Sequence, residues 1–212
     1  MLKTPKFPFD RCHFYFIIAC NADFGFLLDS SGSVDSHWQR QLGFVKQIVK
    51  SINLSSNGGR AAVAEFSNKA ELMIKFSDYI TLKGFESAVD KLDHWHGTTK
   101  IELGLEVALN QMFKQSNGMR PNVPHTLVLI TDAQQTRVEF EKFRKQFNER
   151  KIRVLVILVG NGRKEDIRFL ANRDADLYEA KSFDELITEP FVRSITLCGG
   201  NLKINSLECP IH

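Results

Sequence analysis

The sequence predicts an α/β fold in which a doubly wound, mostly parallel six-stranded sheet has one antiparallel edge strand and helices on both faces. Three uninterrupted apolar runs are typical of strands that are buried on both faces of a parallel sheet. They lie at residues 24–28, 127–130 and 154–159. Segments with helical periodicity alternate with these runs, and that alternation indicates an open α/β sheet.

Three shorter strands complete the predicted sheet. Residues 61–66 and 71–76 are separated by the short Asn68-Lys69 step, which favours a hairpin and therefore an antiparallel pair. A last short strand is expected at residues 176–179.

Amphipathic helices are expected between the strands, because apolar residues recur there at steps of three and four. They are predicted near residues 38–52, 101–113, 140–147 and 183–191. Pro190 should kink or restart the last of them, since proline cannot donate the backbone hydrogen bond and clashes with the preceding turn. Ligands of open α/β sheets bind at the carboxyl ends of the strands. Function is therefore expected in the loops after Leu28, after Ile130 and before Ile101.

The composition excludes several classes of protein. The 212 residues suffice for one well-buried domain, and 43% hydrophobic with 25% charged residues is ordinary for a globular protein. The net charge of +3 is spread along the chain without a dense basic block, so nucleic acid is not expected as a partner. No apolar run is long enough to predict a transmembrane segment.

The two ends of the chain are interpreted separately from the domain, which is expected at residues 23–198. Residues 1–22 combine basic residues with a short apolar stretch and small residues, which favours a signal peptide, or alternatively an N-terminal extension. Residues 199–212 form a C-terminal tail. No cysteine falls between residues 21 and 197, so all four lie at or beyond the ends of the domain: Cys12, Cys20, Cys198 and Cys209. This suits a disulfide in a secreted, extracellular protein, or alternatively free thiols in a cytoplasmic one.

Oxygen-bearing side chains alternate in the loop after the first apolar run. Asp29, Ser31 and Ser33 have the spacing that can direct three oxygen atoms into one pocket. Hard cations such as Mg²⁺ prefer oxygen ligands in near-octahedral geometry. One carboxylate and two hydroxyls supply little negative charge, so a second carboxylate from another loop is needed.

Asp132 is the candidate for that carboxylate, because it follows the run at residues 127–130, where a neighbouring parallel strand would deliver it. Either Thr98 or Thr99, just before the helix expected at Ile101, adds a threonine hydroxyl. The residues together predict a site for one divalent cation.

With these residues the chain resembles the von Willebrand factor type A domain, also called the integrin inserted domain. The metal-ion-dependent adhesion site of that family has a DxSxS loop, a threonine on a second loop and an aspartate on a third. The resemblance implies five metal ligands: Asp29, Ser31, Ser33, Thr99 and Asp132. The pattern Gly-x-Thr-x-Ile-x-x-Gly-Leu, which begins at Gly97, is similar to the anthrax toxin receptor branch and favours Thr99 over Thr98.

The resemblance also implies a function. The ion would be Mg²⁺, or Mn²⁺ or Ca²⁺, and one outward position would accept a Glu or Asp side chain from a partner protein. The partner would be collagen or another matrix protein, and the role would be adhesion rather than catalysis. A ligand-binding rim is expected from Trp95, His96, Thr98 and Gln134. Cys20 and Cys198 resemble the disulfide pair that closes the ends of extracellular members.

Other functions have less support. His94 and His96 are transition-metal ligand types, but no third ligand is evident, so they are interpreted as exposed rim residues. The chain has neither a Gly-x-Ser-x-Gly elbow nor a GxxxxGK[ST] loop. The alternatives are an intracellular scaffold of the same fold without an adhesion role, and a metal-dependent hydrolase using Asp29 and Asp132. The hydrolase lacks a general base other than the two histidines.

Overall fold

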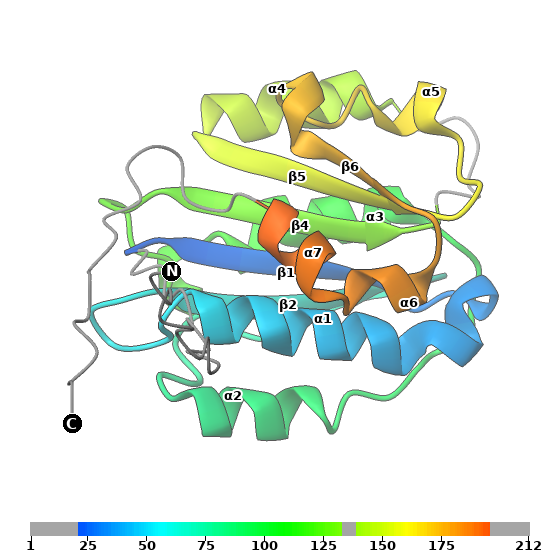
Figure 1. The fold of residues 1–212 in the computed structure, drawn as a ribbon. Coiled ribbons are helices and arrows are strands. Elements are labelled where there is room, and N and C mark those ends of the chain that lie inside the picture. Colours follow the sequence, from blue (N-terminus) through cyan, green and yellow to red (C-terminus); the bar gives the residue numbers. More distant parts are fainter. Residues whose placement is uncertain (1–20, 133–138, 196–212) are drawn as a thin grey trace, which may run out of the picture.

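The computed structural model of the chain describes residues 21–132 and 139–195 (Figure 1). Cys20, Cys198 and Gln134 lie outside the described residues, as do the N-terminal segment and the C-terminal tail. The expected disulfide, signal peptide and domain ends therefore stay predictions. In the described part of the chain, no helix is both long enough and apolar enough to cross a membrane.

Six strands of the described chain form one sheet in the order β3-β2-β1-β4-β5-β6. The strands are β1 (Asp23–Asp29), β2 (Arg60–Phe66), β3 (Ala70–Ile74), β4 (His125–Thr131), β5 (Ile152–Val159) and β6 (Leu177–Ala180). Neighbouring strands are parallel except for the β2–β3 pair, which is antiparallel as expected for a hairpin. The predicted fold class is confirmed.

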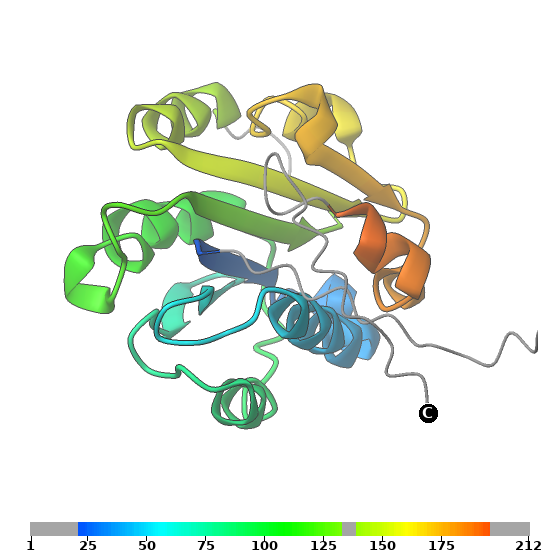
Figure 2. The ribbon, with the colours of Figure 1, turned by 60° about the vertical axis from the view of Figure 1, so that its left-hand side comes forward.

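Helices cover both faces of this sheet (Figures 1 and 2). The α-helices are α1 (Trp38–Ser51), α2 (Leu82–Val89), α3 (Ile101–Val107), α4 (Phe140–Glu149), α5 (Lys164–Ile167), α6 (Phe183–Leu186) and α7 (Glu189–Ser194). One hydrophobic core joins the sheet to α1, α2, α6 and α7, and a second joins it to α3, α4 and α5. Along β1 the cores alternate, since Phe26 and Leu28 belong to the first and Leu27 to the second.

Short 3₁₀ and π segments adjust the ends of these elements. The 3₁₀ turns are η1 (Gly32–His37), η3 (Gln115–Asn117) and η4 (Asp174–Asp176), and η2 (Ala108–Met112) is a π-helical continuation of α3. The helix predicted at residues 101–113 therefore changes its winding halfway. This turns Met112 onto β1 at Gly25, where a Cβ atom would lie only 2.2 Å from the Met112 sulfur.

The last predicted helix is divided at the expected place. α6 ends at Leu186, and α7 begins again with Pro190 in its first turn, where the missing N–H costs no helical hydrogen bond. α2 and α5 were not predicted. α2 begins after Thr81, whose hydroxyl accepts a hydrogen bond from the Gly84 N–H at 3.3 Å.

Candidate functional site

The predicted carboxylates lie at the carboxyl ends of two adjacent parallel strands (right-hand side of Figure 1). Asp29 is the last residue of β1, and Asp132 directly follows β4. The β1–β4 register pairs Leu28 with Ile130, so the loops that follow the two strands leave the sheet side by side. Both aspartates are buried, with Asp29 fully enclosed and Asp132 only 7% exposed.

Hydrogen bonds fix the loop that follows β1. The Asp29 Oδ1 atom accepts from the Ser31 N–H at 3.0 Å, and Oδ2 accepts from the Thr131 hydroxyl at 2.7 Å. The Gln41 side chain of α1 donates to the Asp29 carbonyl at 2.8 Å. The hydroxyls of Ser31 and Ser33 lie 3.1 Å apart. The structure therefore brings the side chains of Asp29, Ser31 and Ser33 into one cluster.

The loop that contains Thr99 reaches the same place through its backbone. The Gly32 N–H donates to the Gly97 carbonyl at 2.8 Å, and Ser31 and Gly97 form an isolated β-bridge. A Cβ atom at Gly97 would lie 2.6 Å from the Ser67 hydroxyl, so only glycine allows this approach without a shift. Thr99 follows two residues later and is half-buried.

The electrostatics of the cluster favour a cation. Burial raises the pKa of Asp29 to about 6, and the negative charge of Asp132 contributes in the same direction against hydrogen bonds from Ser31 and Thr131. The Oδ1 atom of Asp132 is buried without a hydrogen-bond partner among the described residues. A buried carboxylate oxygen normally has a partner, so this atom is available to a metal ion or to its water. The donor set is all oxygen, as hard divalent cations require.

An open cavity of about 520 Å³ adjoins the cluster. Its lining includes Ser33 and Asp132 together with His37, Arg163 and Lys181. The cavity joins oxygen donors to two basic side chains, so a ligand that carries negative charge is favoured there.

The loop after β5 supports Asp132 through close backbone contact. A Cβ atom at Gly162 would lie 2.3 Å from the Asp132 carbonyl oxygen. We expect Gly162→Ala to move Asp132, destabilising the fold by about 1–3 kcal/mol and weakening Mg²⁺ binding. Urea denaturation and calorimetry measure the two effects. Gly43→Ala in α1 is the control, because its Cβ would meet only an ordinary 3.4 Å contact, and equal losses in both variants would contradict the prediction.

The expected rim residues occupy different environments. His96 and Thr98 are exposed, whereas Trp95 is half-buried under the Lys69 ammonium, which lies 4.1 Å from the ring centroid. Gln134 lies outside the described residues, and the role of these side chains in partner binding stays a prediction.

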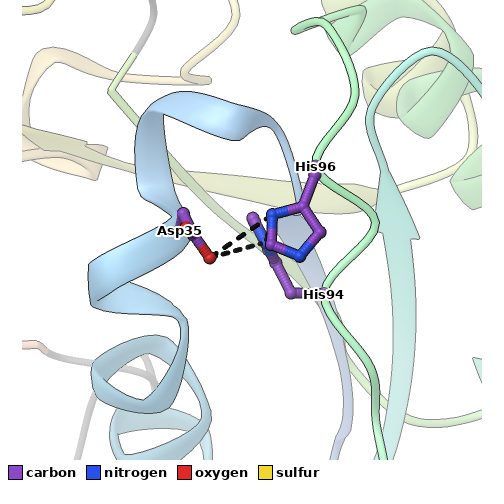
Figure 3. Close-up of side chains that lie close together, drawn as sticks. All are labelled: Asp35, His94 and His96. Atoms are coloured by element: carbon purple, nitrogen blue, oxygen red, sulfur yellow. Dashed lines mark hydrogen bonds and ion pairs between the residues drawn. The ribbon is translucent and has the colours of Figure 1, made fainter.

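The interpretation of His94 was wrong. Its side chain is only 6% exposed, and its Nε2 atom lies 2.9 Å from the Ser31 carbonyl oxygen. A third candidate metal ligand is also present, because Asp35 of η1 lies beside His94 and His96 (Figure 3). Asp35 carries no sequence signal that connects it with histidines about sixty positions away, so only the fold could reveal it.

The sequence also gave no indication of a buried acid next to the site. Glu65 on β2 is fully enclosed, and its carboxyl oxygens have no hydrogen-bond partner among the described residues. Burial, with the nearby charges of Asp93 and Glu71, raises the pKa of Glu65 to about 8, although the positive charge of Lys69 acts against the shift. Glu65 is therefore largely protonated at neutral pH.

Comparison with known proteins finds relatives with similar sequences. Vitrin from Bos taurus is 30% identical over 113 residues, which are 53% of this chain and 17% of vitrin. The collagen alpha-6(VI) chain of Mus musculus is 29% identical over 114 residues, which are 53% of this chain and 5% of the collagen chain. The chain thus spans less than a fifth of the length of either relative.

A solved structure is similar over more of the chain. It is proximal thread matrix protein 1 from the mussel byssus, with a TM-score of 0.74 and 28% identity. The metal-ion-dependent adhesion site (MIDAS) motif of that structure is occupied by zinc. The similarity covers 82% of this chain and 46% of that one. The sequence pattern of the von Willebrand factor type A domain matches residues 23–190, most of the chain. The chain therefore belongs to the von Willebrand factor type A domain family.

Proposed function

We propose that the chain is a protein-binding module in which one Mg²⁺ ion, or Mn²⁺ or Ca²⁺, links the domain to an acidic side chain of a partner. The observation that carries the proposal is the buried Oδ1 atom of Asp132, which has no hydrogen-bond partner within residues 21–132 and 139–195 and lies beside the Asp29–Ser33 loop. Asp29, Ser31, Ser33, Thr99 and Asp132 would hold the ion, directly or through water. When bound, the ion supplies a Lewis-acidic position that accepts a partner carboxylate.

The low charge of the site supports a binding role. Only two of the five proposed ligands are carboxylates, so their charges do no more than balance that of the ion. The neutral hydroxyl ligands are weak donors, which leaves the ion electrophilic enough to attract another carboxylate. Arg163 and Lys181 line the adjoining cavity and increase that attraction.

The relatives suggest the class of partner. One relative is a collagen chain and another is a thread matrix protein by name. We therefore infer that this chain acts outside the cell, within or against the extracellular matrix, and that collagen or another matrix protein supplies the acidic side chain.

The metal site is tested by titrating Mg²⁺ and Mn²⁺ into chelator-stripped protein in a calorimeter. We expect one Mg²⁺ ion per chain, and in Asp132→Asn an affinity at least about tenfold lower, which corresponds to about 1.4 kcal/mol. Asp174→Asn is the matched control, because this exposed aspartate precedes β6 at the opposite end of the sheet. Absence of binding by the unmodified chain, or equal affinities in both variants, would overturn the metal site.

Partner binding is tested separately on surfaces of immobilised collagen and of whole matrix extract. We expect binding in Mg²⁺ that a chelator abolishes and that Asp132→Asn weakens, while Asp174→Asn binds like the unmodified chain. Binding that survives both the chelator and Asp132→Asn would refute the bridging role of the metal.

A further inference from the structure

A second group of metal-ligand side chains lies beside the oxygen cluster. The Nδ1 atoms of His94 and His96 are 3.0 Å apart, and Asp35 Oδ1 is 3.4 Å from the first and 3.3 Å from the second (Figure 3). In a tetrahedral zinc site with bonds of about 2.0–2.1 Å, neighbouring donor atoms are about 3.3–3.4 Å apart. The three atoms therefore already form nearly one face of a zinc tetrahedron.

The His94 ring is held in the orientation that a metal ligand needs. Its Nε2 atom lies 2.9 Å from the Ser31 carbonyl oxygen, which can only accept a hydrogen bond, so Nε2 carries the proton. The lone pair of Nδ1 then points at Asp35 and His96. A ligating histidine usually donates its other N–H to a backbone carbonyl or carboxylate in this way. The Trp38 ring packs against His94 with centroids 5.3 Å apart and limits its rotation.

The backbone of His96 supplies an independent observation. Its φ angle is +55°, in the left-handed region that non-glycine residues adopt at a cost. This conformation turns the ring back so that it meets His94 edge-on, with centroids 4.3 Å apart. Local strain of this kind is found at binding sites, where the surrounding structure holds it in place.

The geometry points to a site for one divalent transition-metal ion, zinc above all, held by Asp35, His94 and His96. Two imidazoles and one carboxylate suit zinc better than magnesium, so this site differs in chemistry from the oxygen cluster. His96 and Asp35 have side chains 60% and 62% exposed, so the fourth position faces solvent and is open to water or to a partner side chain. This inference does not depend on the proposed Mg²⁺ site.

Zinc at this position would connect two of the loops that surround the oxygen cluster. Asp35 lies in η1, two residues after Ser33, while His96 directly precedes Gly97. His94 also bonds to the Ser31 carbonyl. A bound ion would therefore restrain the loop that carries Ser31 and Ser33, and would restrain the loop of Thr99 as well.

The test is a zinc titration of tag-free, chelator-stripped protein, followed by calorimetry and by NMR of the imidazole nitrogens. We expect zinc to shift the ring signals of both His94 and His96. His96→Asn removes the ring and keeps a residue type that tolerates positive φ. His94→Gln keeps a donor for the Ser31 carbonyl. Each variant should weaken zinc binding at this site at least about tenfold.

The controls separate the two metal sites. His37→Asn removes an imidazole that stacks on Phe183 and is not one of the three proposed ligands, called the triad here. The zinc affinity of this variant at the triad should equal that of the unmodified chain. Asp132→Asn should lose the ion at the oxygen cluster and keep the one at the triad. The proposal fails if zinc leaves the His94 and His96 signals unchanged, or if only Asp132→Asn reduces zinc binding.

Discussion

Arg120→Met is expected to lower the free energy of unfolding by about 3–5 kcal/mol, because it leaves a buried carboxylate without its cation. Asp23 at the start of β1 is fully enclosed. The Arg120 side chain donates from Nε to the Asp23 Oδ1 atom at 2.8 Å, while the Arg120 backbone N–H, which the substitution keeps, donates to Oδ2 at 2.7 Å. The same guanidinium donates to the carbonyls of Ala22 and Gly58 at 3.0 Å. The Arg120 side chain therefore connects the start of β1 to the residue before it and to the loop that precedes β2.

Urea denaturation of Arg120→Met and Arg40→Met compares the same substitution at two ion pairs. Arg40 bonds Asp184 at 2.8 Å, but both side chains are largely exposed, at 45% and 65%. Exposed pairs contribute about 0–1 kcal/mol, so Arg40→Met should change stability little. The double variant Asp23→Asn with Arg120→Met should recover part of the loss. Equal losses at Arg120 and Arg40 would show that burial of Asp23 does not determine the effect.

Glu65→Gln is expected to stabilise the protein at and above neutral pH. The pKa of Glu65 is raised from 4.5 to about 8, so the folded chain keeps a proton that the unfolded chain releases between these values. The free energy of unfolding therefore falls as the pH rises through this window and levels off above pH 8. The loss amounts to at most several kcal/mol, since each pKa unit corresponds to about 1.4 kcal/mol.

Chemical denaturation near pH 4.5 and near pH 8 measures this effect. Glutamine has no proton to lose, so the variant should lack this part of the pH dependence and exceed the unmodified chain in stability only at the higher pH. Glu149→Gln, at the exposed end of α4, should keep the full dependence. A parallel pH dependence in the unmodified chain and in Glu65→Gln would disprove a raised pKa at Glu65.

The sequence predicted the sheet because its strands are almost uniformly apolar. In the structure, the first strand extends from Asp23 to Asp29, and the fourth extends from His125 to Thr131. These four polar residues are buried and make hydrogen bonds. Periodicity cannot show such extensions, because it treats a polar residue as the end of a strand. The packing of η2 was invisible for a related reason, since its Met112 side chain occupies the space that Gly25 leaves on a distant strand.

The placement of Asp29 and Asp132 could be predicted because each follows an apolar run typical of a parallel strand. Asp29 and Asp132 are about a hundred positions apart, yet parallel pairing delivers both to one edge of the sheet. Asp35, Glu65 and the buried face of His94 carry no such signal. Their significance depends on side chains from other loops, and contacts of that kind have no period or spacing in the chain.

The two outer strands of the sheet affect how copies of the domain would behave at high concentration. β3 has five residues and β6 has four, and a register irregularity interrupts β3 along its pairing with β2. A lysine–glutamate ion pair flanks each of them, Lys69–Glu71 at β3 and Lys164–Glu179 at β6. Short, charged and irregular edges resist the strand-to-strand joining that leads to aggregation. Copies of the domain are therefore expected to stay separately folded units at high local concentration.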